Sequence, residues 1–433
     1  MTCVRVLAAA LLGTGCTLAA AAETFTFDAA EFARKPFELS GYVEARGDRI
    51  SLNQDGSFYK LGFYNRTVPS NVNRTTLTAK PTGKLRLGET AVLNFRGHLE
   101  YQGDNLDSSH RARFDEGYAS YKPVDGLALD AGKISLRWGK GYAWNPVAFV
   151  ERPKDPNEPE LAREGFGMVT ADFIRNFDGP LQTVAFTPVV VPVSDSLNSD
   201  FGTHGHVNVA GKLYLLYRDT DIDLMFLAGG SRARRIGFDF SRNVGTNLEI
   251  HGEWAHSFEA RQVFVDSAGS LRSQTADARS YLVGMRHLTG SRVTTLVEYY
   301  RNGGGYTEGE LSVFHQLVDN GLASWQANGS AALIQRAAAA SRNGYGQPNA
   351  GRHYLYVRLS QAEPFDILYF TPAITTIANL DDRSLSVSPE VSYIRFRNLD
   401  LRLRLIRLAG GARSDFGEKQ STSRLELRVR YFF

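Results

Sequence analysis

The chain has 433 residues, of which 43 % are hydrophobic and 22 % are charged, and its formal net charge is +3 at pH 7. Its two cysteines, Cys3 and Cys16, lie close to the N-terminus, so the rest of the chain has no residues for disulfides, thiolate metal sites or attached c-type haem. The small net charge gives no reason to expect a nucleic-acid partner.

Residues 1–22 have the pattern of an export signal. Arg5 supplies the positive start, residues 6–12 the apolar stretch, and four alanines at 19–22 the small-residue cleavage zone. The alternatives are a transmembrane helix, for which the stretch is short, and lipid attachment at Cys16, which lacks the usual upstream Leu. We expect cleavage. Because Arg5 is the one charged residue removed, 48 basic residues then remain against 46 acidic ones.

The mature chain is predicted to consist of two parts. Residues 23–36 form a short periplasmic segment, with a helix over 28–34 in which Asp28 is the N-cap and Glu31 the N3 residue. Residues 37–433 form a single barrel, because no linker, block of like charges or change in residue pattern interrupts them. No apolar run approaches the ~18 residues that a membrane helix needs.

Apolar and polar residues alternate with a period of two from residue 37 to the C-terminus, as in strands with one apolar and one polar face. In the first strand Phe37, Leu39 and Val43 share one face. We predict 18 strands, over 37–48, 74–87, 91–102, 112–123, 127–138, 167–176, 181–191, 207–218, 222–230, 236–243, 248–258, 278–287, 292–301, 353–362, 367–379, 385–397, 400–412 and 420–433.

The last strand has the clearest pattern. One face carries Leu425, Leu427, Val429, Tyr431 and Phe433, and the other carries Arg424, Glu426, Arg428 and Arg430. A terminal Phe on such a strand resembles the C-terminal strand of Gram-negative outer-membrane barrels. This resemblance covers about ten residues, and it implies that Tyr431 and Phe433 form a signal for the outer-membrane assembly machinery.

Connection lengths separate the two predicted rims. Long loops at 49–73, 139–166, 192–206, 259–277 and 302–352 all follow odd-numbered strands, whereas the turns after even-numbered strands are short. This asymmetry favours an all-β, antiparallel, up-and-down transmembrane barrel with periplasmic short turns. A soluble propeller would show a repeat of about 40–50 residues, which is absent. Trp138 and Trp254, near the long-loop rim, are predicted to lie at the membrane interface.

The loop over 139–166 is the first candidate for function. A Trp-Gly pair at 138–139 and an Asn-Pro pair at 145–146 resemble a loop of porin-like families whose substrates are poorly known. A long, proline-marked loop either folds into the lumen and narrows it, or stays on the surface as a rim. The candidate constriction residues are Lys140, Trp144, Asn145, Pro146, Asp155, Glu158 and Glu160.

The longest loop, 302–352, contains helix signals. Thr307 and Glu310 have the spacing of a capping box, and Tyr306 can pack against Leu311. A second, Ala-rich stretch at 331–340 is also helix-prone. We expect this helical extracellular loop to pack over or into the mouth of the barrel.

Basic residues dominate the predicted inward face of one wall, formed by the last two and first two strands. These residues are Arg46, Arg74, Lys80, Lys84, Arg86, Arg402, Arg404, Arg424, Arg428 and Arg430. The same wall carries four acidic residues, Glu38, Glu44, Asp48 and Glu426. An internal ion-pair ladder would use some of these groups. An excess of positive charge is expected to remain unless other strands supply acids, and such a lining favours anions.

Other chemistry has weak signals. Gly303–305 lacks the Lys-Ser/Thr of a phosphate-binding loop, and no serine motif matches the nine scattered histidines. His204 with His206, or His251 with its acidic neighbours Glu249 and Glu253, offer metal ligands, but solvated or lumen-lining roles are the simpler interpretation. We therefore expect no enzymatic activity, no metal and no cofactor.

The expected function is an outer-membrane channel of the porin type that passes small hydrophilic, anionic solutes. Two alternatives stay open: a transporter of hydrophobic compounds, which needs an apolar lumen, and a non-conducting scaffold or sleeve for a partner protein. The expected partners are membrane lipid, lipopolysaccharide, the assembly machinery and a small-molecule solute. A homo-trimer is compatible with such a barrel, although no interface is identifiable in the sequence.

Overall fold

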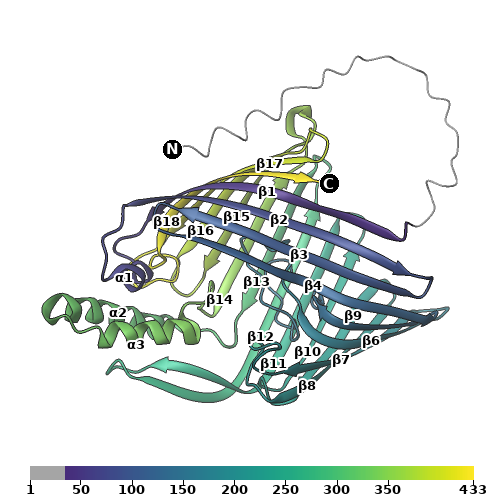
Figure 1. Cartoon of the computed structure of the whole chain (residues 1–433), viewed down its shortest axis with the longest axis horizontal. Helices are drawn as coiled ribbons and strands as arrows, with labels where there is room; N and C mark the ends of the chain where they lie inside the picture. Colours follow the sequence, from purple (N-terminus) through teal and green to yellow (C-terminus); the bar gives the residue numbers. More distant parts are fainter. Residues whose placement is uncertain (1–34) are drawn as a thin grey trace. The chain divides into compact units, whose positions relative to one another are not determined.

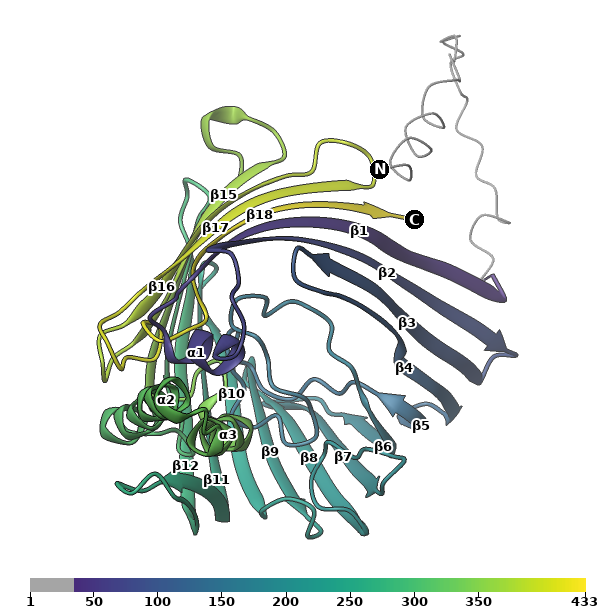
Figure 2. The ribbon, with the colours of Figure 1, turned by 60° about the vertical axis from the view of Figure 1, so that its left-hand side comes forward.

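The computed structural model describes residues 35–433, in which 18 antiparallel strands form a closed barrel (Figures 1 and 2). Each strand pairs with its neighbour in sequence, and the last strand pairs with the first, so that Ala45 lies opposite Val429. The predicted fold class and the count of 18 are confirmed. The predicted signal at 1–22 and the helix at 28–34 lie outside the described residues.

The strands are β1 Phe37–Leu52, β2 Asn71–Leu87, β3 Ala91–Asp104, β4 Ser108–Val124, β5 Leu127–Ile134, β6 Phe166–Asn176, β7 Leu181–Val193, β8 His206–Tyr217, β9 Thr220–Ala228, β10 Arg235–Val244, β11 Leu248–Val265, β12 Leu271–Leu288, β13 Val293–Arg301, β14 His353–Gln361, β15 Phe370–Asn379, β16 Leu385–Tyr393, β17 Leu399–Ala409 and β18 Ser421–Phe432. The α-helices are α1 Ser57–Phe63, α2 Glu308–Asn328 and α3 Ala332–Ala340, and α3 continues into the short turn η2 Ser341–Tyr345. In the described part of the chain, no helix combines the length and the apolarity that a membrane-crossing helix needs.

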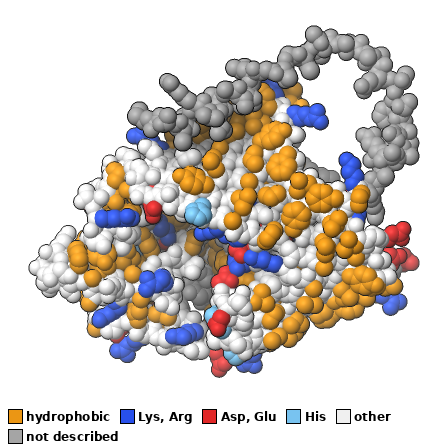
Figure 3. Space-filling view, viewed as in Figure 1, with side chains coloured by type: hydrophobic (Ala, Val, Ile, Leu, Met, Phe, Trp, Pro, Cys, Tyr) orange, Lys and Arg blue, Asp and Glu red, His pale blue; other side chains and the backbone are white. Residues whose placement is uncertain are grey.

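The two faces of the strand wall have opposite character. Outward-facing side chains such as Leu77, Leu99 and Leu427 are about half exposed, and hydrophobic side chains cover much of the outer wall in Figure 3. Inward-facing polar side chains are buried instead, among them Glu298 and Glu426. This arrangement is the reverse of a soluble protein, in which apolar side chains face the core.

Two predictions at the long-loop rim were wrong. Most of the loop predicted over 259–277 is strand, because β11 and β12 continue as a long hairpin with a turn at 266–270, and its tip lies beside α2 and α3 (Figures 1 and 2). Both faces of this extension carry polar residues, and a bulge after Ser257 shifts the register, so the period-two signal is lost. Trp138 does not face lipid, because β5 ends at Ile134 and Trp138 is buried against Val147.

Helices α1, α2 and α3 pack together at the long-loop end of the barrel and form what we call the helical cap (Figures 1 and 2). The predicted capping box of α2 is confirmed, since Thr307 accepts from the Glu310 amide and Glu310 from the Thr307 amide. Helix α1, within the loop expected at 49–73, was not predicted. Lys60 of α1 donates to Asp319 of α2 at 2.6 Å.

The cap contains a buried histidine. His315 of α2 is 2 % exposed, and neither ring nitrogen has a hydrogen-bond partner within residues 35–433. Burial lowers the pKa of His315 to about 4, against an opposing effect of Glu418. The other charged groups that face the imidazole are Lys419 and Asp415 from the loop at 410–420 and Asp319 on its own helix.

We expect the cap to loosen as the pH falls from about 6.5 to about 4. In this window an undocked His315 binds a proton that the docked one excludes, so the docked state is progressively disfavoured. Hydrogen exchange of the α2 amides, corrected for its intrinsic pH dependence, should rise accordingly. His315→Leu should abolish the rise and His204→Leu, in an exposed loop, should not. An equal rise in α2 hydrogen exchange in both variants would contradict a role of His315 in loosening the cap.

Candidate functional site

The loop at 135–165, between β5 and β6, is bound at its start by an inward-facing carboxylate of β11. Glu253 is 3 % exposed. It accepts hydrogen bonds from the amides of Gly141 at 2.6 Å and Val147 at 3.3 Å. Its Oε1 also accepts from the side chain of Asn145 at 3.0 Å. One buried carboxylate thereby satisfies three polar donors of the loop, as burial of charge requires.

A second carboxylate, Glu298 of β13, binds the next residues of the same loop. Glu298 is fully buried and accepts from the amides of Tyr142 and Ala143, the latter at 2.8 Å. Nε2 of His251 lies 2.9 Å from Glu298 Oε1. Glu298 was not predicted, although it is the one acidic residue on the inward face of β13. His251, expected to line the lumen, lies within this cluster.

Trp144 packs the loop against the aromatic side chains of two strands. Its ring stacks on Tyr300 of β13 at 5.1 Å between centroids and also contacts Tyr354 and Tyr356 of β14. Trp144 is 7 % exposed, and Pro146 beside it is half-buried. These contacts hold the first half of the loop on the β11–β14 side of the lumen.

The second half of the loop binds the arginines of β17 and β18. Glu158 lies 2.8 Å from Arg402 Nη2, 2.6 Å from Arg404 Nη2 and in direct contact with Arg428. Burial alone would raise the pKa of Glu158, but Arg404, Arg402 and Arg428 lower it to about 2. Glu158 therefore stays ionised at neutral pH. The loop contacts β11–β14 with one half and β17–β18 with the other, so it crosses the lumen.

Three further candidates have specific places in or near the lumen. Lys140 Nζ lies 3.0 Å from Asp223 Oδ2 of β9. Glu160 accepts from the hydroxyl of Tyr142 at 2.9 Å. Asp155 is exposed on the loop. Whether these residues set the constriction remains a prediction.

Nine of the ten predicted wall cations have a carboxylate within 3.3 Å. The pairs are Arg46–Asp48, Arg74–Asp104, Lys80–Asp115, Arg86–Glu38, Arg402–Glu158, Arg404–Glu158, Arg424–Asp48, Arg428–Glu426 and Arg430–Glu44. Within residues 35–433, Lys84 has no such pair. Because β3, β4 and the loop supply some of these acids, less positive charge on the wall is left unpaired than its ten basic and four acidic residues alone would predict.

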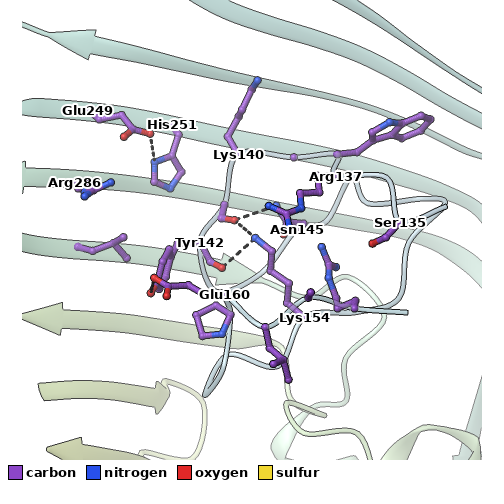
Figure 4. A pocket seen from close by; sticks show the side chains of 18 residues that line it. Ser135, Arg137, Lys140, Tyr142, Asn145, Lys154, Glu160, Glu249, His251 and Arg286 are labelled. Atoms are coloured by element: carbon purple, nitrogen blue, oxygen red, sulfur yellow. Dashed lines mark hydrogen bonds and ion pairs between the residues drawn. The ribbon is translucent and has the colours of Figure 1, made fainter. Parts of the chain in front are cut away.

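Two chambers lie on opposite sides of the loop. The inner chamber, shown in Figure 4, has a volume of about 300 Å³ and is lined by Lys140, Lys154, Glu249 and Arg286 among others. Glu249 and Arg286 place it toward the short-turn side, because they lie next to the turns at 245–247 and 289–292. The outer chamber, of about 620 Å³, lies toward the long loops. Its lining includes Arg46, Arg404, Phe416, Lys419 and Arg424.

A much smaller cavity of about 40 Å³, which we call the neck, shares residues with both chambers. Tyr142 and Glu160 line it from the loop, and Arg358, Glu390 and Arg402 line it from β14, β16 and β17. Arg358 Nη2 donates to Glu390 at 2.6 Å within the wall on one side of it. This volume is close to that of one or two water molecules. Arg358 and Glu390 were not predicted as site residues.

The remaining candidates have ordinary local roles. Across residues 35–433, no cluster of three or more potential ligands can hold a metal ion. His204 lies 2.6 Å from Asp195 in an exposed loop, and the amide of Gly303 donates to Ser280. Tyr431 and Phe433 are each 47 % exposed at the end of the barrel wall, and their role in assembly remains a prediction.

No family model and no curated protein matches the sequence. Among solved structures, a triple mutant of the Rhodopseudomonas blastica porin has a TM-score of 0.44 and 10 % identity, covering 92 % of this chain and all of that one. Another mutant of the same porin has the same TM-score and coverages, with 9 % identity. At this level of similarity these porins carry no information about the solute of this chain. The barrel is established by its own strand pairing.

Proposed function

We propose that the protein is an outer-membrane channel for small hydrophilic solutes with a preference for anions. The observation that carries this proposal is the lining of the two chambers. The inner chamber has five basic and two acidic side chains, and the outer chamber has four basic and two acidic ones. A positive lining favours anions in a pore.

Two of the acids on the β11–β13 side do little to offset this lining. Glu253 and Glu298 are buried, and their oxygens accept hydrogen bonds from the loop backbone. Arg137 and Arg286, in contrast, line the inner chamber and have no carboxylate partner among the described residues. With a Debye length of about 8 Å at physiological ionic strength, such groups act on solutes that pass them.

Location in the membrane is supported by the apolar outer face of the strands. A half-exposed band of Leu, Val, Phe and Tyr around a polar interior is what a lipid environment stabilises. Export through the predicted signal, cleavage at residue 22 and a homo-trimeric assembly belong to this proposal as predictions. The polar chambers give less support to a hydrophobic-compound transporter, and a scaffold would need no chambers.

The reversal potential in a KCl gradient across a planar bilayer tests the proposed selectivity. We expect an anion-selective value that increases at low salt, because screening then weakens. The double variant Arg137→Gln/Arg286→Gln should lower the anion preference. Arg292→Gln, at an exposed turn outside the chambers, is the matched control. Cation selectivity would overturn the anion preference, and an absence of any conductance would overturn the channel.

A further inference from the structure

The outer chamber is enclosed by parts of the chain that are distant in sequence. The loop at 155–161 forms one boundary, and β1, β17 and β18 form the barrel side. Phe58 of α1, residues 346–348 and the loop at 416–420 close it toward the helical cap. Its volume of about 620 Å³ falls within the ~300–1,000 Å³ that is typical of small-molecule sites.

One side of the outer chamber is cationic and held in position. Asp48 fixes two arginines, since it lies 2.8 Å from Arg424 Nε and 3.3 Å from Arg46 Nε. Among the described residues no hydrogen bond involves Nη1 of Arg46 or Nη1 of Arg424. Arg404 also lines this side but is paired with Glu158 and Glu426. Glu158 and Asp155 line the loop boundary of the chamber. Guanidinium donors held in this way are suited to a carboxylate oxygen.

The other side of the outer chamber is apolar. Ile406 and Leu408, on the inward face of β17, are half-buried, and Phe416 is 6 % exposed. Lys419 joins the two sides, because its Nζ lies 5.4 Å from the ring centroid of Phe58 and 6.0 Å from that of Phe416. Inorganic ions gain no favourable contact from these apolar side chains, which are poorly hydrated.

We propose that the outer chamber is a binding site for a small organic anion with an apolar body, such as an aromatic carboxylate. The carboxylate meets Arg46 and Arg424, and the ring lies against Phe416, Ile406 and Leu408. This proposal rests on the proposed channel and names the solute class that the channel captures before the neck. An organic cation would be repelled, and a neutral sugar would leave the arginines unused.

The test uses the full mature chain in lipid nanodiscs and isothermal titration calorimetry with four compounds. Benzoate has both features, benzamide keeps the ring without the charge, acetate keeps the charge without the ring, and benzylammonium reverses the charge. We expect benzoate to bind about tenfold more tightly than benzamide or acetate, because charge-assisted bonds and apolar burial act together. Benzylammonium should show no binding.

Two variants separate the two sides of the chamber. Arg46→Gln should weaken benzoate and leave benzamide unchanged, whereas Phe416→Ala should weaken benzoate and benzamide and leave acetate unchanged. Arg292→Gln should alter none of them. The heat-dependent shift in gel mobility of each variant shows whether its barrel has folded.

The outcomes distinguish this proposal from the proposed function. KCl conductance without tighter binding of benzoate would overturn the site and leave the channel standing. Tight benzoate binding without conductance would support the site and overturn the channel. Equal affinities for benzoate, benzamide and acetate, or benzoate binding that is insensitive to both Arg46→Gln and Phe416→Ala, would also overturn the site.

Discussion

Replacing Glu158 by Ala is expected to raise both the conductance of the channel and its preference for anions. Glu158 is the carboxylate on which Arg402, Arg404 and Arg428 converge, and it holds the second half of the loop against β17 and β18. Removing one partner of a buried ion-pair cluster typically costs ~3–5 kcal/mol. We expect the loss in free energy of unfolding to lie at or below that range in Glu158→Ala, because Glu426 still contacts Arg404 and Arg428 at 3.0 Å.

Single-channel recording in symmetric KCl, followed by a KCl gradient, measures both effects of Glu158→Ala. Conductance should rise and become noisier because the loop is free to move, and the reversal potential should shift toward the anion value because three arginines lose a counter-charge. Asp178→Ala removes an exposed carboxylate at a short turn, outside the residues that line either chamber, and is the control. A conductance unchanged from wild type would show that the loop is held without Glu158.

Much of the fold could be predicted from sequence, because each strand has its own signal. Side chains in a membrane barrel face lipid or lumen, and strands such as β18 therefore show period two over most of their length. The signal failed where neither face is apolar, as in the distal half of the β11–β12 hairpin. It also failed for α1, whose seven residues are too short for a helical period and dock through Phe58 onto Phe314.

The site was less predictable, because its interactions join residues that are far apart in sequence. Pro-rich spacing was enough to single out the loop that contains Glu158. The pairing of Glu158 with Arg404, 246 residues away, could not be predicted, because nothing local specifies which wall a loop will meet. The same holds for Glu253, which was expected only to line the lumen and instead binds the amides of Gly141 and Val147.

Replacing Leu427 by Arg is expected to block insertion of the barrel. Leu427 lies in the middle of β18 and is 55 % exposed on the outer face. Its register partners are Gly47 of β1 and Leu403 of β17. An arginine at mid-bilayer on the lipid face costs ~2–4 kcal/mol, and neighbours of this kind provide no carboxylate to offset it. Folding into lipid vesicles, followed by the heat-dependent shift in gel mobility, measures the loss.

The matched control for Leu427→Arg is Thr78→Arg, which introduces the same side chain on the inward face of β2. The register places Thr78 between Glu44 of β1 and Glu100 of β3, so an arginine there meets two carboxylates in a polar lumen. Thr78→Arg should insert as well as the wild type and change selectivity alone. If both variants inserted equally well, the outer face of β18 would not be in contact with lipid. If both failed, the loss would reflect the bulk of arginine in a strand, and the location of the barrel in a membrane would lose this support.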